Sequence, residues 1–273
     1  MSLRTLFVSV ALLLLSLSRA AVAEPRDDFH HLGEINKASL VMLEEGGFVP
    51  QKLARKIARG IDKVIDEQNR PGRARSSNYL DFEARLIEIA GSEASRLHTG
   101  RSRQDIGSTY RRMALRESLL ETYEGLLAAR LALLELAAEH VDTIVPAYTH
   151  GVQAQPTSFA HYLLAFSAAF ERDAARFEQA YARLNRSPLG AAALGTSGFA
   201  LDRERLAELL GFDGVVENSY DANLVSSVDS KIELANALST SAITVGQLMQ
   251  NLHTQYHNPS PWILLAEEQT DVS

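Results

Sequence analysis

Apolar residues recur every three or four positions along much of the chain, which is the spacing of one face of an α-helix. Segment 53–68 shows this pattern and is followed by the turn-forming pair Pro71-Gly72. A second, shorter pattern covers 82–90. No region has the alternating pattern of a strand-rich protein. The apolar positions of the first stripe are Leu53, Ile57, Ile61, Val64 and Ile65.

A much longer helical pattern begins at Ser102 and continues to about His140 with no proline. Ser102 and Asp105 have the spacing of a capping box, in which each side chain bonds the backbone near the other. A helix of this extent is roughly 50 Å long at 1.5 Å per residue. Its predicted apolar stripe is Ile106, Tyr110, Met113, Leu120, Leu127, Leu131 and Leu134.

Two further long helices are predicted, separated by a short one. Proline favours the first helical position, so the second long helix is predicted to begin at Pro156 and to end near Asn185. A loop over 189–199 and a short helix capped by Asp202 follow. The third long helix is predicted over 230–257. The apolar stripe of the second long helix is Phe159, Leu163, Phe166, Phe170, Phe177 and Leu184.

These patterns predict an all-α fold: a small N-terminal helical domain over 24–103, then a long-helix bundle over 104–273. Three helices of such length present wide apolar stripes that one chain cannot cover. We therefore expect several copies of the chain to complete the bundle.

The first residues resemble a signal peptide. Arg4 supplies a positive start, 6–17 are mostly apolar, and Ala21-Val22-Ala23 has the small-x-small pattern of a cleavage site. We expect residues 1–23 to be removed and the protein to be exported, with the periplasm as its compartment and no membrane association after cleavage. An uncleaved membrane anchor is the alternative, and a cytoplasmic location follows if the interpretation of this segment is wrong.

Composition narrows the function classes. Of the 273 residues, 27 are Lys or Arg and 34 are Asp or Glu, giving a net charge of −7, which argues against a nucleic-acid-binding protein. The chain has no cysteine, so disulfides, thiolate nucleophiles and zinc ribbons are excluded. No cofactor motif is present, and we expect no cofactor.

The densest cluster of chemically active residues precedes the first long helix. His98, Arg101, Ser102 and Gln104 gather where free backbone N–H groups and the helix dipole favour an anion. Gly100 would let the backbone approach a ligand closely. These features predict a carboxylate-binding site, and a solvated basic turn with an ordinary helix cap is the alternative.

A second cluster lies around His150. Thr149, His150 and Gln155 place a titratable ring, a hydroxyl and an amide in one turn, which suits proton transfer near neutral pH. A structural turn with a hydrogen-bonded histidine is the alternative. His161 is expected to pack inside a helix. His253 and His257 have the spacing of a metal pair, but no third ligand is evident and no metal site is predicted.

Four segments in order carry a resemblance to a known family. LHTGRSRQD (97–105), YTHGVQAQP (148–156), the segment 187–214 that begins SPLGAAALG, and ENSYDA (217–222) are similar to conserved blocks of the argininosuccinate lyase branch of the aspartase/fumarase superfamily. The resemblance extends from about Asn78 to the last residue.

That resemblance implies a homotetramer whose active sites combine three subunits, and a carbon–nitrogen lyase that eliminates fumarate from argininosuccinate to give arginine. It implies that His150 is catalytic, as acid or base partner of a serine on a signature loop. The same resemblance assigns substrate binding to His98, Arg101, Ser102, Gln104, Thr149 and Gln155.

Departures from the family pattern keep other functions open. Gln104 stands where the family usually has Asn, and the run after Asp221 lacks the usual charged pattern. A lyase acting on another N-substituted aspartate, such as an aminopolycarboxylic acid, is therefore an alternative, and a non-catalytic structural protein on the same scaffold is another. The chain also stops before the signature loop, so we expect a truncated fragment that is inactive by itself.

Overall fold

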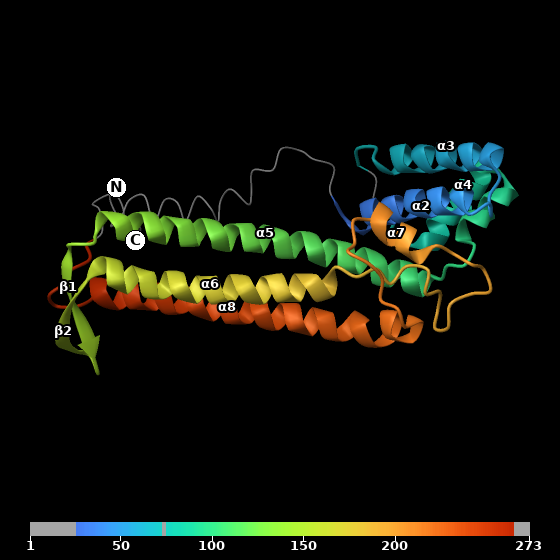
Figure 1. Ribbon diagram of the computed structural model, residues 1–273. Coiled ribbons are helices and arrows are strands. Elements are labelled where there is room, and N and C mark those ends of the chain that lie inside the picture. Colours follow the sequence, from blue (N-terminus) through green and yellow to red (C-terminus); the bar gives the residue numbers. More distant parts are fainter. Residues whose placement is uncertain (1–25, 73–74, 265–273) are drawn as a thin grey trace. The chain divides into compact units, whose positions relative to one another are not determined.

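The computed structural model describes residues 26–72 and 75–264, and it confirms an all-α fold to which one β-hairpin is added (Figure 1). The predicted signal peptide, 1–23, lies outside the described residues. The elements are α2 (Asp28–Glu45), α3 (Gln51–Gln68), α4 (Tyr79–Ala90), the 3-10 helix η1 (Ser92–His98), α5 (Arg103–Glu139), β1 (Ile144–Thr149), β2 (Val152–Ser158), α6 (Phe159–Leu184), α7 (Arg203–Leu209), the π-helical turn η2 (Asp221–Val225) and α8 (Ser226–Tyr256).

The chain divides into two compact units, each built from separate segments. The first, called the N-terminal unit, contains residues 26–118 and Ala180–Glu233. The second, called the bundle unit, contains Leu119–Gln179 and 234–264. Helices α5, α6 and α8 contribute residues to both units. The sequence predicts a different division, into the consecutive domains 24–103 and 104–273, and this division stays a prediction.

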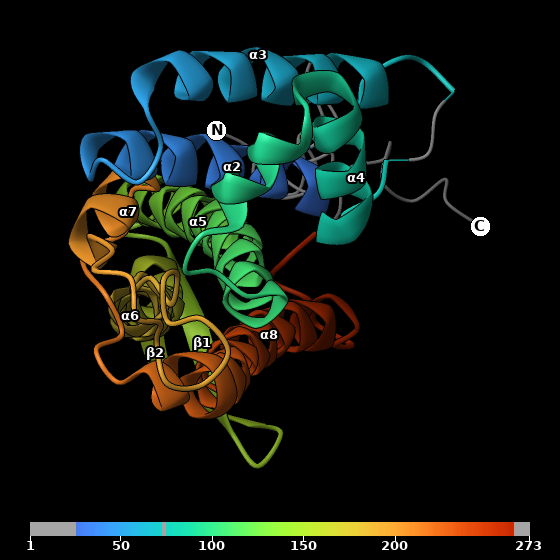
Figure 2. The ribbon, with the colours of Figure 1, turned by 90° about the vertical axis from the view of Figure 1, so that its right-hand side faces the viewer.

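Helices α2, α3 and α4 of the N-terminal unit lie side by side (Figure 2), and their buried apolar residues form much of the core of this unit. Asp27 and Asn78 begin α2 and α4 by accepting hydrogen bonds from backbone N–H groups two or three residues later. Ile57 and Ile61 of α3 are fully buried, as the predicted stripe requires. Gly60 lets α3 approach α4 closely, because a Cβ there would lie 2.7 Å from Leu86 Cδ1.

Two arginines of α5 bind the ends of other helices in the N-terminal unit. The buried guanidinium of Arg112 donates to the carbonyl oxygen of Leu184 at 3.0 Å, at the end of α6, and to that of Ser226 at 3.0 Å. Arg116 donates to the carbonyl oxygens of Leu210 and Gly211, just beyond α7. The carbonyls of Leu184, Leu210 and Gly211 lie at helix C-termini and have no partner inside their own helix, so these cations stabilise the helix ends. The Ser226 carbonyl lies at the start of α8 and also accepts from Ser230 Oγ.

The capping box at the start of α5 is confirmed. Asp105 Oδ1 accepts from the Ser102 N–H at 2.8 Å, and Ser102 Oγ accepts from the Gln104 N–H at 3.2 Å. The helix then continues for 37 residues.

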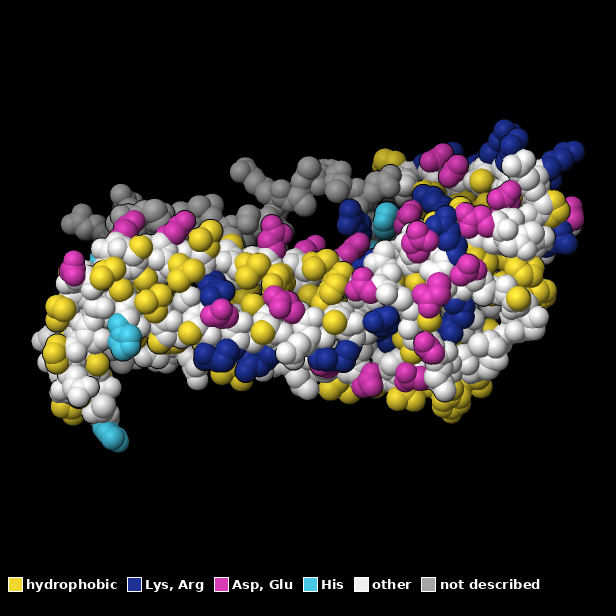
Figure 3. Space-filling model, viewed as in Figure 1, with side chains coloured by type: hydrophobic (Ala, Val, Ile, Leu, Met, Phe, Trp, Pro, Cys, Tyr) yellow, Lys and Arg dark blue, Asp and Glu magenta, His cyan; other side chains and the backbone are white. Residues whose placement is uncertain are grey.

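The predicted apolar stripe of α5 is only partly buried. Ile106 and Met113 are buried, but the positions from Leu120 onward are exposed; the buried residues of that half are instead Leu119, Leu126, Leu133, Leu136 and Ala137. Leu119 and Leu120, and likewise Leu126 and Leu127, differ by about 100° around the helix. The apolar sector of α5 is therefore wider than the part that this chain covers, and Figure 3 shows apolar side chains along the long helices.

Helix α6 begins at Phe159, so the prediction that it begins at Pro156 is wrong. Pro156 lies in β2, directly opposite Pro146 of β1, in an antiparallel hairpin that the sequence did not predict. Neither proline has a backbone N–H to donate to the ladder. Because the two face each other, neither leaves a non-proline residue directly opposite without its donor. Ser158 begins the helix instead, because its Oγ accepts from the His161 N–H at 3.1 Å.

The bundle unit is held by apolar packing and by pairs between α5 and α6. Phe170 and Phe177 of α6 are fully buried, which confirms the predicted face. Tyr123 donates to Glu178 at 2.5 Å and Arg130 pairs with Glu171 at 2.9 Å. Among the described residues, no helix combines the length and apolarity needed to cross a membrane.

Candidate active site

The predicted anion site at the start of α5 lies in the N-terminal unit, and its two arginines have different environments. Arg101 is buried, and its guanidinium donates to Asn36 Oδ1 at 3.0 Å, Ser39 Oγ at 2.9 Å and the Tyr79 hydroxyl at 3.4 Å. These three neutral acceptors tie Arg101 to α2 and α4. Its guanidinium is thus engaged within the fold.

The accessible cation at this helix start is Arg103, which the sequence-based prediction did not include among its site residues. Arg103 is the first residue of α5 and is exposed, next to the half-buried Ser102 and the exposed Gln104. A guanidinium at a helix N-terminus adds its own charge to the positive end of the helix dipole, which favours a carboxylate. The sequence signal that could have identified Arg103 is its position directly after the helix cap, Ser102.

His98 is neutral at physiological pH. Burial, together with the positive charges of Arg101 and Arg103, lowers the pKa of His98 to about 4. Its ring stacks on Tyr79 with centroids 4.6 Å apart. A neutral imidazole can donate and accept hydrogen bonds, so His98 is suited to orient a substrate rather than to supply a positive charge.

Asp105 joins the first conserved segment to the third. Its fully buried carboxylate accepts at 3.0 Å from the N–H groups of both Gly190 and Ala192, in addition to that of Ser102. Ala192 holds a left-handed backbone conformation, with φ of +54°, that is unfavourable for a residue with a side chain. The hydrogen bond to Asp105 helps to hold this strained loop.

A second polar connection runs from α5 through η2 to the same loop. Gln104 Nε2 donates to the carbonyl oxygen of Asn223 at 3.2 Å, and Asn223 Nδ2 donates to the carbonyl oxygens of Ala192 and Ala193 at 2.7 and 3.0 Å. Asn223 is buried and lies in the π-helical turn, a conformation that often marks functional sites. The sequence-based prediction missed Asn223, which lies where the chain departs from the family pattern.

Gly100 serves packing within the chain. Its φ is +67°, and a Cβ there would lie 2.4 Å from Leu201 Cδ1 and 3.0 Å from Ser197 Oγ. The structure shows a close approach of Gly100 to the loop after residue 187, and the predicted approach of its backbone to a ligand stays a prediction.

The second cluster lies in the bundle unit, at the tip of the β1–β2 hairpin. His150 and Gly151 form the two-residue turn with φ of +51° and +77°, the signs required by a type I′ turn. Thr149, His150 and Gln155 are all exposed. The hairpin thus presents an imidazole, a hydroxyl and an amide on its exposed surface.

The sequence patterns also concern His161, His253 and His257. His161 is exposed, so the expectation that it packs in the helix is wrong, and its Nδ1 lies 2.8 Å from Thr157 Oγ1. His253 and His257 are near neighbours with ring centroids 4.6 Å apart. Within the described ranges, no group of three or more His, Asp or Glu side chains could hold a metal ion.

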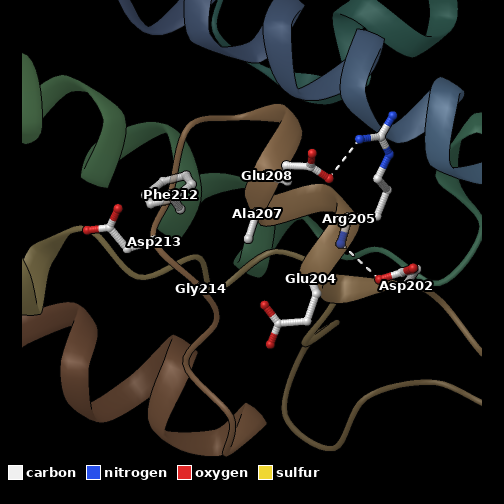
Figure 4. Close-up of a pocket in the computed structure, with 8 residues that line it drawn as sticks. All are labelled: Asp202, Glu204, Arg205, Ala207, Glu208, Phe212, Asp213 and Gly214. Atoms are coloured by element: carbon white, nitrogen blue, oxygen red, sulfur yellow. Dashed lines mark hydrogen bonds and ion pairs between the residues drawn. The ribbon is translucent and has the colours of Figure 1, made fainter.

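A shallow pocket of about 420 Å³ lies beside α7 (Figure 4), and several of its lining side chains form hydrogen bonds and ion pairs within the fold. Asp202 caps α7 by accepting from the Arg205 N–H, and Arg205 pairs with Glu208 and with Glu45. Most of its polar groups therefore already have partners within the fold.

Comparison with known proteins identifies the family. A family described as Lyase matches residues 31–262, which is most of the chain. The chain belongs to this family, in the argininosuccinate lyase branch of the aspartase/fumarase superfamily.

Curated relatives support the branch. The chain is 40% identical over 220 residues to argininosuccinate lyase of Methanosarcina acetivorans, covering 80% of this chain and 44% of that protein. It is 41% identical over 215 residues to argininosuccinate lyase of Anoxybacillus flavithermus, covering 77% and 46%. This lyase-family chain thus spans about half the length of the curated relatives it matches.

Solved structures of the superfamily have the same fold. An EDDS lyase in complex with formate matches with a TM-score of 0.82 and 32% identity, covering 93% of this chain and 49% of that one. A fumarate lyase from Mesorhizobium sp. BNC1 matches with a TM-score of 0.71 at 23% identity, which supports the fold alone.

Proposed function

We propose that the protein containing this chain is a carbon–nitrogen lyase that cleaves argininosuccinate to fumarate and arginine. A base removes a proton from the carbon next to the succinyl carboxylate, and the C–N bond breaks. The electron pair of that bond leaves with the nitrogen, which takes a proton as arginine departs. Negative charge accumulates on the carboxylate before the bond breaks, so fixed donors near it accelerate the reaction.

The observation that carries this proposal is the fixed conformation of the residues at the start of α5. Arg103 is exposed there, and the segment behind it is fixed by buried Asp105 and Arg101. A rigid cationic site of this kind suits a dicarboxylate, since the donors need not reorganise as charge develops. The argininosuccinate lyases that the chain resembles over 80% of its length are consistent with that substrate.

His150 is proposed as the catalytic acid or base partner, with Thr149 and Gln155 holding the succinyl carboxylate. All three are exposed on the hairpin, where an imidazole can reach a substrate. Their exposure also suits a site completed by another copy of the chain. We propose a homo-oligomer, a tetramer as in the family, in which the exposed apolar side chains of α5 and α8 become buried.

The test is release of fumarate. The protein encoded by the complete reading frame around this sequence is incubated with argininosuccinate, and fumarate and arginine are measured in equal amounts over time. Production of both supports the proposal. No fumarate from argininosuccinate, in an enzyme that is folded and oligomeric, contradicts it.

A second candidate is elimination of fumarate from another N-substituted aspartate, such as an aminopolycarboxylic acid. Gln104 favours this candidate, because its side chain is longer than that of the Asn usual in the family. Its amide donates a hydrogen bond to the backbone of Asn223 and so alters the polar groups beside Arg103. The likeness to EDDS lyase at 32% identity is also consistent with it. Comparing kcat/KM for argininosuccinate and for ethylenediamine-disuccinate distinguishes the two candidates.

We also propose that the protein is exported, on the basis of residues 1–23. Fractionation of cells that express the complete reading frame, with N-terminal sequencing, tests this. A mature protein that begins at Glu24 outside the cytoplasm supports export, and an intact Met1 in the cytoplasm contradicts it.

A further inference from the structure

A basic groove runs along α3 in the N-terminal unit, apart from the candidate active site. Its volume is about 910 Å³, and α3 forms one side while Ile89 of α4 and Glu93 and Arg96 of η1 form the other. The cations that line it are Lys52, Arg55, Lys56, Arg59, Lys63 and Arg96. The only carboxylate among the lining residues is that of Glu93.

The spacing of these cations places them on one face of the helix. Lys52, Arg55, Lys56, Arg59 and Lys63 fall within an arc of about 100° when each residue turns the helix by 100°. From Lys52 to Lys63 the stripe is about 16 Å long at 1.5 Å per residue. All five side chains are exposed, and dark blue side chains lie over α3 in Figure 3.

None of the six cations forms an ion pair with a carboxylate within the described residues, although the charge of Lys63 helps to lower the pKa of Glu67. The ion pairs near this part of the fold are formed by Arg85 with Glu67 and Glu88, which lie outside the groove. Unpaired like charges at this density repel one another, and in a concave site they raise the local concentration of anions. The net charge of −7 for the whole chain conceals this local excess of positive charge.

We propose that this groove binds a phosphate-rich polyanion, a short chain of linked phosphates. Guanidinium forks and lysine ammonium groups are the side chains that bind phosphate oxygens. No aromatic side chain lines the groove, so it lacks the stacking platform by which proteins bind the bases of single-stranded nucleic acids. Most of the apolar face of α3 is buried in the core, and the apolar side chains of Leu53 and Ile89 in the groove are only partly exposed, which leaves little apolar surface to insert into a lipid membrane.

Calorimetric titration of the chain with sodium tripolyphosphate tests the proposal. Binding is expected at low salt, with affinity falling steeply between ~50 and ~200 mM salt as counterions are released. The double variant Lys56→Gln with Arg59→Gln is expected to raise Kd about tenfold and to reduce the salt dependence. Both side chains are exposed, so circular dichroism should show an unchanged fold.

A matched control removes the same charges elsewhere. Lys37→Gln with Arg172→Gln alters exposed positions outside the groove, and its Kd is expected to stay within about twofold of the parent chain. Equal weakening in both double variants, or no binding by the parent chain, overturns the proposal. So does orthophosphate binding as tightly as tripolyphosphate, or duplex DNA or phosphatidylglycerol vesicles binding more tightly per phosphate.

Discussion

The carboxylate of Asp105 accepts a hydrogen bond from the backbone N–H of Gly190, 85 residues further along the chain, at 3.0 Å. The same carboxylate caps the start of α5 through Ser102. One buried side chain therefore orients the helix start that carries Arg103 and fastens the loop that follows Ser187. This arrangement makes separate positions in the sequence one rigid structure.

Asp105→Asn is expected to lower the free energy of unfolding by about 2–4 kcal/mol, because an amide NH₂ would face backbone donors that then lack an acceptor. Urea denaturation with an unchanged m-value measures this loss. Asp213→Asn is the matched control, since Asp213 is exposed and is expected to change stability by less than about 0.5 kcal/mol. Equal small effects in both variants would contradict the role assigned to Asp105.

Gly100→Ala is expected to destabilise the chain more than Gly47→Ala. Both glycines have positive φ, +67° and +75°, so both variants incur the same kind of backbone strain. At Gly47 nothing lies within 4 Å of an added Cβ, whereas at Gly100 the Leu201 side chain lies at 2.4 Å. The difference between the variants, about 1–3 kcal/mol in thermal or urea unfolding, measures the contact with Leu201. A Gly47 variant that is equally unstable would show that strain alone matters.

The pH dependence of stability is expected to contain two opposing contributions. The pKa of His98 falls from 6.5 to about 4 on folding, so the unfolded chain binds the extra proton and stability decreases as pH falls from 6.5 to 4. Burial raises the pKa of Asp105 from 3.8 to about 6, so the folded chain keeps that proton and stability increases as pH falls from about 6 to 3.8.

Variants separate these contributions. His98→Gln is expected to lose less stability on acidification than the parent chain, and Asp105→Asn to lose more. Unfolding free energies measured at half-unit pH steps give the slopes, each limited to about 1.4 kcal/mol per pH unit for one proton. A histidine ring signal that is absent from His98→Gln and titrates near pH 6.5 in the parent chain would refute the burial effect on His98.

Arg103→Gln is expected to affect catalysis, whereas Arg101→Gln is expected to affect stability. In the complete protein, loss of the exposed Arg103 guanidinium is expected to lower kcat/KM for the substrate about 10- to 1000-fold, with little change in unfolding. Loss of Arg101 leaves the Asn36, Ser39 and Tyr79 oxygens without their donor, so stability decreases. Steady-state kinetics and urea unfolding of both variants check this. A fully active, stable Arg103 variant would remove Arg103 from the proposed site.

Association is expected to depend on the uncovered apolar sector of the long helices. Leu131 and Ile243 are 57% and 63% exposed, so Leu131→Lys with Ile243→Lys leaves the packing within one chain intact. The double variant is expected to elute from a sizing column as a smaller species than the parent. Leu80→Lys, at an exposed position of α4, is the control and is expected to leave the elution volume unchanged.

Local chemistry in the sequence determined the helices themselves. Ser102, Asp105 and Asp202 begin α5 and α7 as predicted, because a cap needs only residues two or three positions away. The buried face of α6 and the all-α class follow from the same short-range periodicity. The family is also evident from the sequence, since its conserved segments occur in order.

Tertiary contacts decided what short-range rules could not. Pro156 became part of a strand because its partner, Pro146, lies ten residues earlier and Ser158 offered a competing cap. Burial, set by α2 and α4, separated Arg101 from Arg103, although both looked equivalent in sequence. Asn223 joined Gln104 to the loop across more than a hundred residues. In each case the deciding partner is distant in the chain, so only the folded structure brings the two groups together.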